Sequence, residues 1–135
     1  MKRTIFAGFL LMAFLAVSCA TRPGVIPENL TPAELIQRAQ EASDRYRYSV
    51  SLHYYETLIE RFPFDIDSVI AAEYEIAFIH FKQRRYAVAR DGFTNLLERY
   101  NTPDAILLPQ QFRILSERIL LTIDEREGQR NRARS

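Results

Sequence analysis

The sequence predicts an all-α protein in which antiparallel helical hairpins stack as a short solenoid. No stretch alternates apolar and polar residues for long enough to form a convincing strand. Helix-breaking residues gather at 63–67 and 101–103, and the segments between them have the periodicity of helices. A helical pattern ending at residue 62 recurs at residue 100, and internal repeats of this kind are typical of stacked helical units.

The first 18 residues are expected to be a lipoprotein signal peptide. Two basic residues precede an apolar run at 5–17, which is too short to span a bilayer because a spanning helix needs about 20 apolar residues. The run continues as AVSC at 16–19, which resembles the lipobox of bacterial lipoproteins. This resemblance implies acylation of Cys19. An ordinary cleaved secretory signal or a retained N-terminal anchor is the alternative.

Residues 19–30 are expected to form a lipidated tether, because they contain Pro23, Gly24 and Pro27 and show no apolar periodicity. Ala20, and not Asp, follows the cysteine. By analogy with enteric lipoproteins, this favours the periplasmic face of the outer membrane.

A helical domain is expected over 31–127. Thr31 is expected to cap the first helix, with Pro32 in its first turn and Glu34 closing a capping box. The expected helices are 32–45, 48–62, 67–83, 86–100 and a fifth that ends at residue 127. The fifth begins at residue 104 or 110, because a proline at 109 is tolerated only in a first turn. Residues 128–135 have one apolar side chain and predict a disordered basic tail.

The repeat has an offset of 38 residues, since LIERF at 58–62 reappears as LLERY at 96–100. The same offset pairs Tyr48 with Tyr86, Ser51 with Ala89, Tyr55 with Phe93 and Ala39 with Ala77. Small residues let two antiparallel helices approach closely, and an aromatic residue one turn later fills the space between hairpins.

This pattern resembles the tetratricopeptide repeat (TPR), a helix–turn–helix unit of about 34 residues. The paired residues above take the family's small and aromatic positions, and Pro63 takes its terminal proline. Leu58 and Leu96 stand where the family has a small residue, which is a departure. The resemblance covers 32–100 and implies two repeats closed by a capping helix.

The segments YYETLIERFPF at 54–64 and YAVAR at 86–90 resemble segments of TPR lipoproteins of the BamD type, which serve outer-membrane protein assembly. They are also similar to the periplasmic TPR domain of Tol-associated envelope proteins. The BamD type has more repeats than this chain. The resemblance therefore implies a TPR lipoprotein, and it implies the specific BamD role less directly.

Composition and motifs argue against several other functions. The chain carries 18 Lys+Arg and 17 Asp+Glu, so its near-neutral charge disfavours nucleic-acid binding, and net charge supports no partner. One cysteine and two histidines are fewer ligands than a metal site needs, and no phosphate loop or nucleophile motif occurs. We therefore expect no enzyme activity and no cofactor.

The expected partner-binding groove lies on the first helix of each hairpin, as the TPR resemblance implies. Its residues are Gln40, Arg47, Tyr74, Phe78, Phe81, Lys82 and Arg85, with Ile36, Ser43, Phe112 and Ser116 in further equivalent positions. The aromatic stripe at 74, 78 and 81 fits either a groove for a partner's segment or core packing against the last helix. The basic residues at 82–85 fit a solvated helix end or a grip on a partner's carboxylate.

The sequence thus predicts a non-enzymatic adaptor that is lipid-anchored in a bacterial envelope and holds another envelope protein in its groove. A carrier of an apolar ligand or unfolded chain, and a purely structural lipoprotein, are the alternatives. Because repeat arrays generally need about three units, self-association is also plausible.

Overall fold

The computed structural model describes residues 24–134, so Cys19 and the signal-peptide prediction lie outside the described residues. The helices are α1 (Pro32–Asp44), α2 (Tyr48–Arg61), α3 (Ile66–Lys82), α4 (Tyr86–Glu98) and α5 (Gln110–Arg132), with short 3₁₀ segments η1 (Arg99–Asn101) and η2 (Pro103–Leu107). No strand occurs in this part of the chain, which confirms the all-α class.

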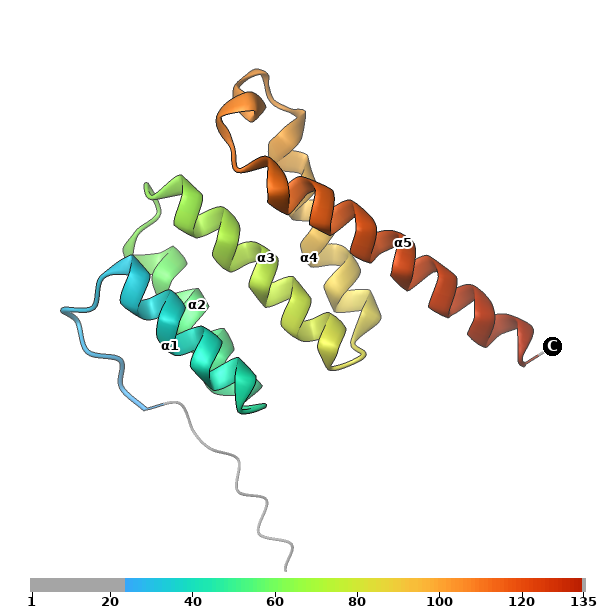
Figure 1. Ribbon diagram of the computed structural model, residues 1–135, viewed down its shortest axis with the longest axis horizontal. Coiled ribbons are helices and arrows are strands. Elements are labelled where there is room, and N and C mark those ends of the chain that lie inside the picture. Colours follow the sequence, from blue (N-terminus) through green and yellow to red (C-terminus); the bar gives the residue numbers. More distant parts are fainter. Residues whose placement is uncertain (1–23, 135) are drawn as a thin grey trace, which may run out of the picture.

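The helices pack in chain order (Figure 1). α1 pairs with α2 and α3 pairs with α4, each as an antiparallel hairpin, while α2 packs on α3 and α5 packs on α4 and α3. Within the described range, no helix has the length and apolar character that crossing a membrane would require. The first four helices match the predicted ranges to within a turn, and α5 takes the later of its two expected starts.

Helix starts at one end of the stack carry strong side-chain caps. Thr31 accepts a hydrogen bond from the Glu34 backbone N–H at 3.3 Å, and Glu34 Oε2 accepts one from the Thr31 N–H at 2.9 Å. This capping box confirms the prediction. Asp65 caps α3 in a related way, because its Oδ1 accepts from the Ser68 N–H at 3.3 Å.

Positions related by 38 residues have equivalent surroundings in the two hairpins. The buried pairs are Ala39 and Ala77, Ser51 and Ala89, Tyr55 and Phe93, and Leu58 and Leu96. The turns match as well, since Tyr46 and Arg84 both have left-handed φ angles, 57° and 60°. The repeat in the sequence is therefore a repeat of local structure.

Small residues lie where paired helices cross most closely. Ser51 Oγ donates a hydrogen bond to the Ala39 carbonyl oxygen at 2.7 Å, which joins α2 to α1. A Cβ atom added to Gly92 would lie 2.9 Å from the Ala77 Cβ atom. Larger side chains at these crossings would push the helices apart.

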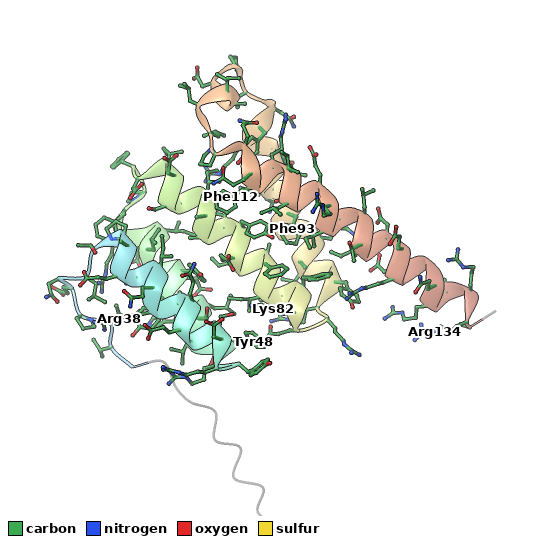
Figure 2. All side chains as sticks on the ribbon, in the orientation of Figure 1. Arg38, Tyr48, Lys82, Phe93, Phe112 and Arg134 are labelled. Atoms are coloured by element: carbon green, nitrogen blue, oxygen red, sulfur yellow. The ribbon has the colours of Figure 1, made fainter. Side chains whose placement is uncertain are left out.

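The C-terminal core lies between α3, α4 and α5. Its buried members are Ile70, Tyr74, Ala77, Ala89, Phe93, Leu96, Tyr100 and Ile123. Figure 2 shows Phe93 of α4 and Phe112 of α5 close to each other beside α3. Both rings contact Tyr74, with centroid distances of 5.6 Å and 5.3 Å. The core therefore holds α5 against the second hairpin.

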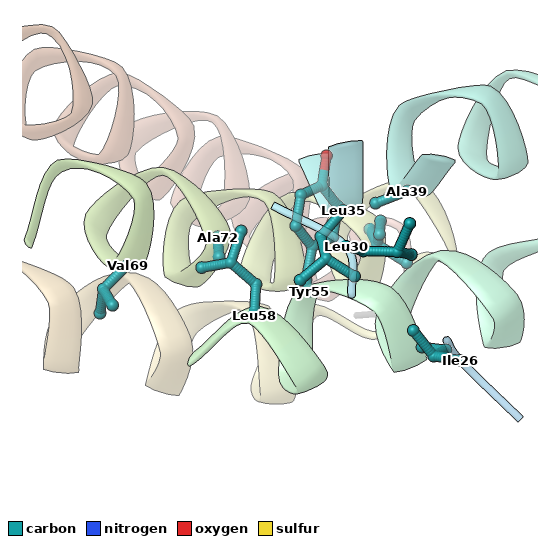
Figure 3. Close-up of a cluster of buried hydrophobic side chains, with 9 residues drawn as sticks. Ile26, Leu30, Leu35, Ala39, Tyr55, Leu58, Val69 and Ala72 are labelled. Carbon is teal, nitrogen blue, oxygen red and sulfur yellow. The ribbon is translucent and has the colours of Figure 1, made fainter. Parts of the chain in front are cut away.

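The N-terminal core joins α1, α2 and α3 (Figure 3). Its buried members are Ile26, Leu30, Leu35, Ala39, Tyr55, Leu58, Val69, Ala72 and Ile79. Val69, Ala72 and Ile79 come from α3, which also supplies three members of the C-terminal core. α3 is thus shared by the two cores.

The tether prediction was wrong for residues 26–30, which are part of the folded domain. Ile26 and Leu30 are buried in the N-terminal core. Arg61 donates hydrogen bonds to the carbonyl oxygens of Pro27 at 2.6 Å and Ile26 at 3.0 Å. Two apolar side chains in a short stretch with a glycine and prolines make no sustained helical or strand pattern, so the sequence could not reveal that the folded domain holds them.

The expected basic tail from residue 128 was also wrong, because α5 continues to Arg132. A glycine costs a helix about 1 kcal/mol relative to alanine and does not by itself end one. The residues after Gly128 are mostly good helix formers, and the arginines in the last turn interact favourably with the negative end of the helix dipole.

Candidate functional site

A groove of about 310 Å³ lies between α1 and α3, and we call it the α1–α3 groove. It is lined by Gln40, Ser43 and Asp44 of α1, Tyr55 of α2, and Glu75, Phe78 and Lys82 of α3. These residues come from both hairpins, so the groove exists only when the hairpins are stacked.

Lys82 bridges the two walls of the groove. Its Nζ donates a hydrogen bond to Ser43 Oγ at 2.6 Å. The same Nζ lies 5.4 Å from the ring centroid of Tyr48 and 5.2 Å from that of Phe78. Figure 2 shows Lys82 reaching from α3 toward Tyr48. Cation–π attraction and the hydrogen bond therefore hold this ammonium group at the groove, although the residue is exposed.

Tyr55 supplies an unused hydroxyl group at the floor of the groove. The residue is only 1% exposed, and its Oη atom has no hydrogen-bond partner. Burial raises the pKa of this phenol, and the nearby Glu75 and Asp44 carboxylates raise it further, so it stays protonated. A buried hydroxyl without a partner costs about 1–3 kcal/mol. The oxygen atom is almost inaccessible, so an acceptor on a bound segment would remove that cost only after the side chains over it move.

Glu75 is the partly buried carboxyl group beside this phenol. Burial raises its pKa, the Lys82 ammonium lowers it, and the Asp44 carboxylate raises it, with a net upward shift. The groove thus offers carboxylates that accept hydrogen bonds, a phenol and an ammonium that donate them, and the apolar face of Phe78. This set suits the alternating N–H and C=O groups of a peptide.

The raised pKa of Glu75 predicts how the free energy of unfolding depends on pH. Because its pKa is raised in the folded state, ionisation disfavours folding, and stability falls as pH rises from the ordinary carboxyl value through the raised one. Glu75→Gln removes this penalty. We expect urea unfolding at pH 7 to show a more stable variant, with the advantage disappearing below the ordinary carboxyl pKa. Equal gains at both pH values would contradict this account.

The structure gathers four of the expected groove residues in the α1–α3 groove: Gln40, Ser43, Phe78 and Lys82. Sequence reasoning missed Tyr55, Asp44 and Glu75 there. Glu75 could have been found, because it lies three residues before Phe78 and therefore on the same face of α3. The structure supplies the position of Tyr55, which belongs to the neighbouring helix.

The aromatic stripe of α3 divides between core and surface. Tyr74 is buried in the C-terminal core, which favours the packing interpretation for this residue. Its ring stacks on Phe78 at 5.8 Å, and Phe78 stacks on Phe81 at 5.9 Å. Phe81 in turn contacts Tyr86 at 5.8 Å and lies under the Arg126 guanidinium at 4.9 Å. Of the three rings, only Phe78 lines the α1–α3 groove.

Arg47 and Arg85 lie outside the α1–α3 groove. Each is the last residue of a turn, immediately before α2 or α4. Arg47 faces the far side of α1, beside Glu41, and the Arg85 guanidinium lies 3.3 Å from His80 Nδ1. The prediction that they line the groove was therefore wrong, because they lie in the turns and not on the groove-facing side of α1 or α3.

A second cleft, of about 460 Å³, lies between α3 and α4. Ile76, Val88 and Leu96 form its apolar part, and an ion pair between Arg99 and Glu73 at 2.5 Å lies at its edge. Among residues 24–134, no three His, Cys, Asp or Glu side chains converge in a way that could hold a metal ion. The described surface therefore offers binding clefts and no assembled metal cluster.

The chain is similar to a protein of Treponema pallidum (strain Nichols) described as an uncharacterized protein. The two are 35% identical over 105 residues, which are 76% of this chain and 42% of the relative. The chain thus spans about two fifths of the length of this curated relative. No protein-family model matches the sequence, and no solved structure matches it.

Proposed function

We propose that this protein is a lipid-anchored TPR-like adaptor of a bacterial cell envelope, resembling BamD-type lipoproteins. The repeat supports this proposal most directly. Buried small and aromatic residues recur at the same places in two hairpins, and the left-handed turn residues Tyr46 and Arg84 recur at the same offset. Such arrays commonly present a surface for binding another protein.

The single observation that carries the adaptor role is the unsatisfied phenol of Tyr55 in the α1–α3 groove. A protein under selection for stability alone would gain from phenylalanine there. The groove has its own cation in Lys82 and its own carboxylates in Asp44 and Glu75. We propose that it takes a segment of another envelope protein, whose backbone acceptor reaches Tyr55.

The proposed anchor is an acylated Cys19, and the proposed location is the periplasmic face of the outer membrane. One role for such a protein is in outer-membrane protein assembly, and another is as a subunit of a transporter or division complex. No catalytic role is proposed, because the groove offers hydrogen bonds and an apolar wall but no activated nucleophile.

The carrier alternative has less support. It requires an open aromatic surface on α3, yet Tyr74 is covered by Phe93 and Phe112, and Phe81 is covered by Tyr86 and Arg126. These neighbours already occupy the space that an apolar ligand would need. A purely structural lipoprotein leaves the buried Tyr55 hydroxyl without a purpose.

Cross-linking in living cells tests the adaptor proposal. The tagged full-length protein is cross-linked, extracted from membranes, captured and analysed for proteins that accompany it in fixed proportion. Gln40→Arg places a large cation in the groove, so we expect at least a tenfold loss of the captured partner, the effect of about 1.4 kcal/mol.

Gln37→Arg is the matched control, because it is the same change on the exposed surface of the same helix, outside the groove. It should leave capture unchanged. A second arm, Cys19→Ser, should release the protein from the membrane fraction. Equal capture by the Gln40 and Gln37 variants would refute the groove, and membrane retention of the Cys19 variant would refute the lipid anchor.

A further inference from the structure

The structure separates charges that nearly cancel in the whole chain. α1, α3 and α5 all finish at one end of the stack (Figure 1), which is formed by segments 44–47, 82–86 and 126–134. These segments hold nine exposed basic residues and two acidic ones. The nine define the basic end: Arg45, Arg47, Lys82, Arg84, Arg85, Arg126, Arg130, Arg132 and Arg134.

The opposite end has the reverse charge. Segments 28–34, 60–67 and 98–104, which lie at the starts of α1 and α3 and the finish of α4, hold seven acidic residues and two basic ones. A protein with almost no net charge therefore has a strong charge asymmetry along its helices. Such an asymmetry orients a molecule in an electric field even when net charge does not attract it.

The two turns of the basic end carry residues that do not favour stability. Tyr46 and Arg84 have the left-handed backbone that glycine adopts most easily. Arg47 and Arg85 occupy the N-cap positions of α2 and α4 and make no side-chain cap hydrogen bond. A cation at that position also opposes the helix dipole. Both turns thus retain side chains that the fold itself does not require.

The turn before α4 and the end of α5 form one continuous surface. Arg84, Arg126 and Arg130 line a single depression with Tyr86. Arg126 donates a hydrogen bond to Tyr86 Oη at 2.9 Å and so holds α5 beside the turn. Tyr46, which is 80% exposed, adds an aromatic side chain to the other turn. Arginine and tyrosine together suit the interface between water and lipid headgroups.

The N-terminal segment runs toward this end. Figure 1 shows this segment turning back from the start of α1. Ile26 lies in a depression with His53 and Thr57 of the middle of α2. Only four residues lie between Cys19 and Gly24, so their Cα atoms are five residue steps apart, a reach of at most about 18 Å. An acylated Cys19 would therefore keep the folded domain within contact distance of the bilayer.

We propose that the basic end docks onto an anionic phospholipid surface and orients the domain with its acidic end facing away from the bilayer. This inference rests on the proposed lipid anchor, which supplies the first attachment, and not on the groove partner. The lipid anchor holds the chain at the membrane, and a basic surface beside it is a common additional attachment that sets how the domain lies on the bilayer. Each arginine near an anionic surface contributes about fivefold to the partition.

Tryptophan fluorescence tests the orientation, because the chain has no tryptophan of its own. Ser49→Trp places one at the exposed start of α2, at the basic end, and Phe64→Trp places one at the acidic end. The full-length protein is reconstituted into phosphatidylcholine vesicles with or without phosphatidylglycerol, both containing brominated lipid. We expect quenching of the Ser49 reporter only with phosphatidylglycerol, and little quenching of the Phe64 reporter in either.

Removing charge should reverse this result without unfolding the protein. Arg47→Ser with Arg85→Ser supplies two good N-caps, so the melting temperature should rise by a few degrees while quenching at position 49 is lost. Arg38→Ser with Arg113→Ser removes the same charge from exposed positions elsewhere and should change neither quenching nor its dependence on phosphatidylglycerol. High salt should weaken the effect, because the Debye length shortens from about 8 Å at 0.15 M to about 3 Å at 1 M.

Two results would overturn the proposal: equal quenching of the Ser49 reporter in both kinds of vesicle, or stronger quenching of the Phe64 reporter. Neither depends on the α1–α3 groove. Loss of partner capture with retained quenching would therefore count against the adaptor role alone, and the opposite combination would count against the membrane-docking surface alone.

Discussion

Phe93→Ala should lower the free energy of unfolding by about 3–5 kcal/mol, which is the range for removing a fully buried phenylalanine side chain. The residue is 0% exposed and belongs to the C-terminal core. Its ring lies 5.6 Å from that of Tyr74, so the vacated space would open between α3 and α4, below α5. Neither α3 nor α4 can close that space without shifting the other helix or α5.

Urea unfolding followed by circular dichroism measures this effect. Phe64→Ala is the control, because Phe64 is 93% exposed, and its removal should change stability by no more than about 0.5 kcal/mol. A loss below about 1 kcal/mol for Phe93→Ala would mean that the core around α4 is not packed as the structure shows.

The same substitution, glycine to alanine, should have opposite effects at the two helical glycines. Gly128→Ala meets only the flexible end of Arg132, at 3.9 Å, and should gain about 1 kcal/mol of helix propensity. Gly92→Ala places its methyl group 2.9 Å from Ala77 Cβ, which is fixed to the backbone of α3. Overpacking of this kind costs about 1–3 kcal/mol, so the variant should be less stable than the natural protein.

A double substitution isolates the contact. Ala77→Gly removes the methyl group that Gly92→Ala would meet, so the pair should be more stable than the sum of the two single changes predicts. Melting temperature and urea midpoint both report this coupling. Strict additivity would show that α3 and α4 do not approach each other so closely at residues 77 and 92.

Local signals explain why the helices could be predicted from the sequence. Thr31 and Glu34 mark the start of α1 by a reciprocal cap, and Pro63 and Pro103 fall where helices end. Because the repeat pairs equivalent positions, the helical pattern of one hairpin supported the prediction of the other. These features act over a few residues, so a single sequence contains them.

The error at the N-terminal segment came from interactions between segments that are distant in the sequence, whereas the error at the end of α5 came from treating Gly128 as the end of a helix. Ile26 and Leu30 appear in a proline-containing stretch without sustained periodicity, and only the packed helices of the N-terminal core make them core residues. The separation of charge between the two ends was also not visible in the sequence. Acidic and basic segments follow one another along the chain, and they gather at opposite ends only when the helices pack antiparallel.

The candidate site was partly visible in the sequence. Four lining residues were predicted because they lie on groove-facing positions of the first helix in each hairpin: Gln40, Ser43, Phe78 and Lys82. Tyr55 was assigned only a packing role, as the aromatic residue that fills the space between hairpins, and its repeat partner Phe93 has no hydroxyl group. The difference between these two equivalent aromatic residues is the one sequence clue to the polar floor of the groove.

The sharing of α3 by both cores has a thermodynamic consequence. Lifting the α1–α2 hairpin away would uncover Val69, Ala72 and Ile79 on one side of α3 while the C-terminal core stayed closed. This opening would also divide the α1–α3 groove, whose walls come from the two parts that separate. A segment bound there acts as a clasp: its binding free energy adds to that of hairpin docking, so occupancy and closure are linked equilibria.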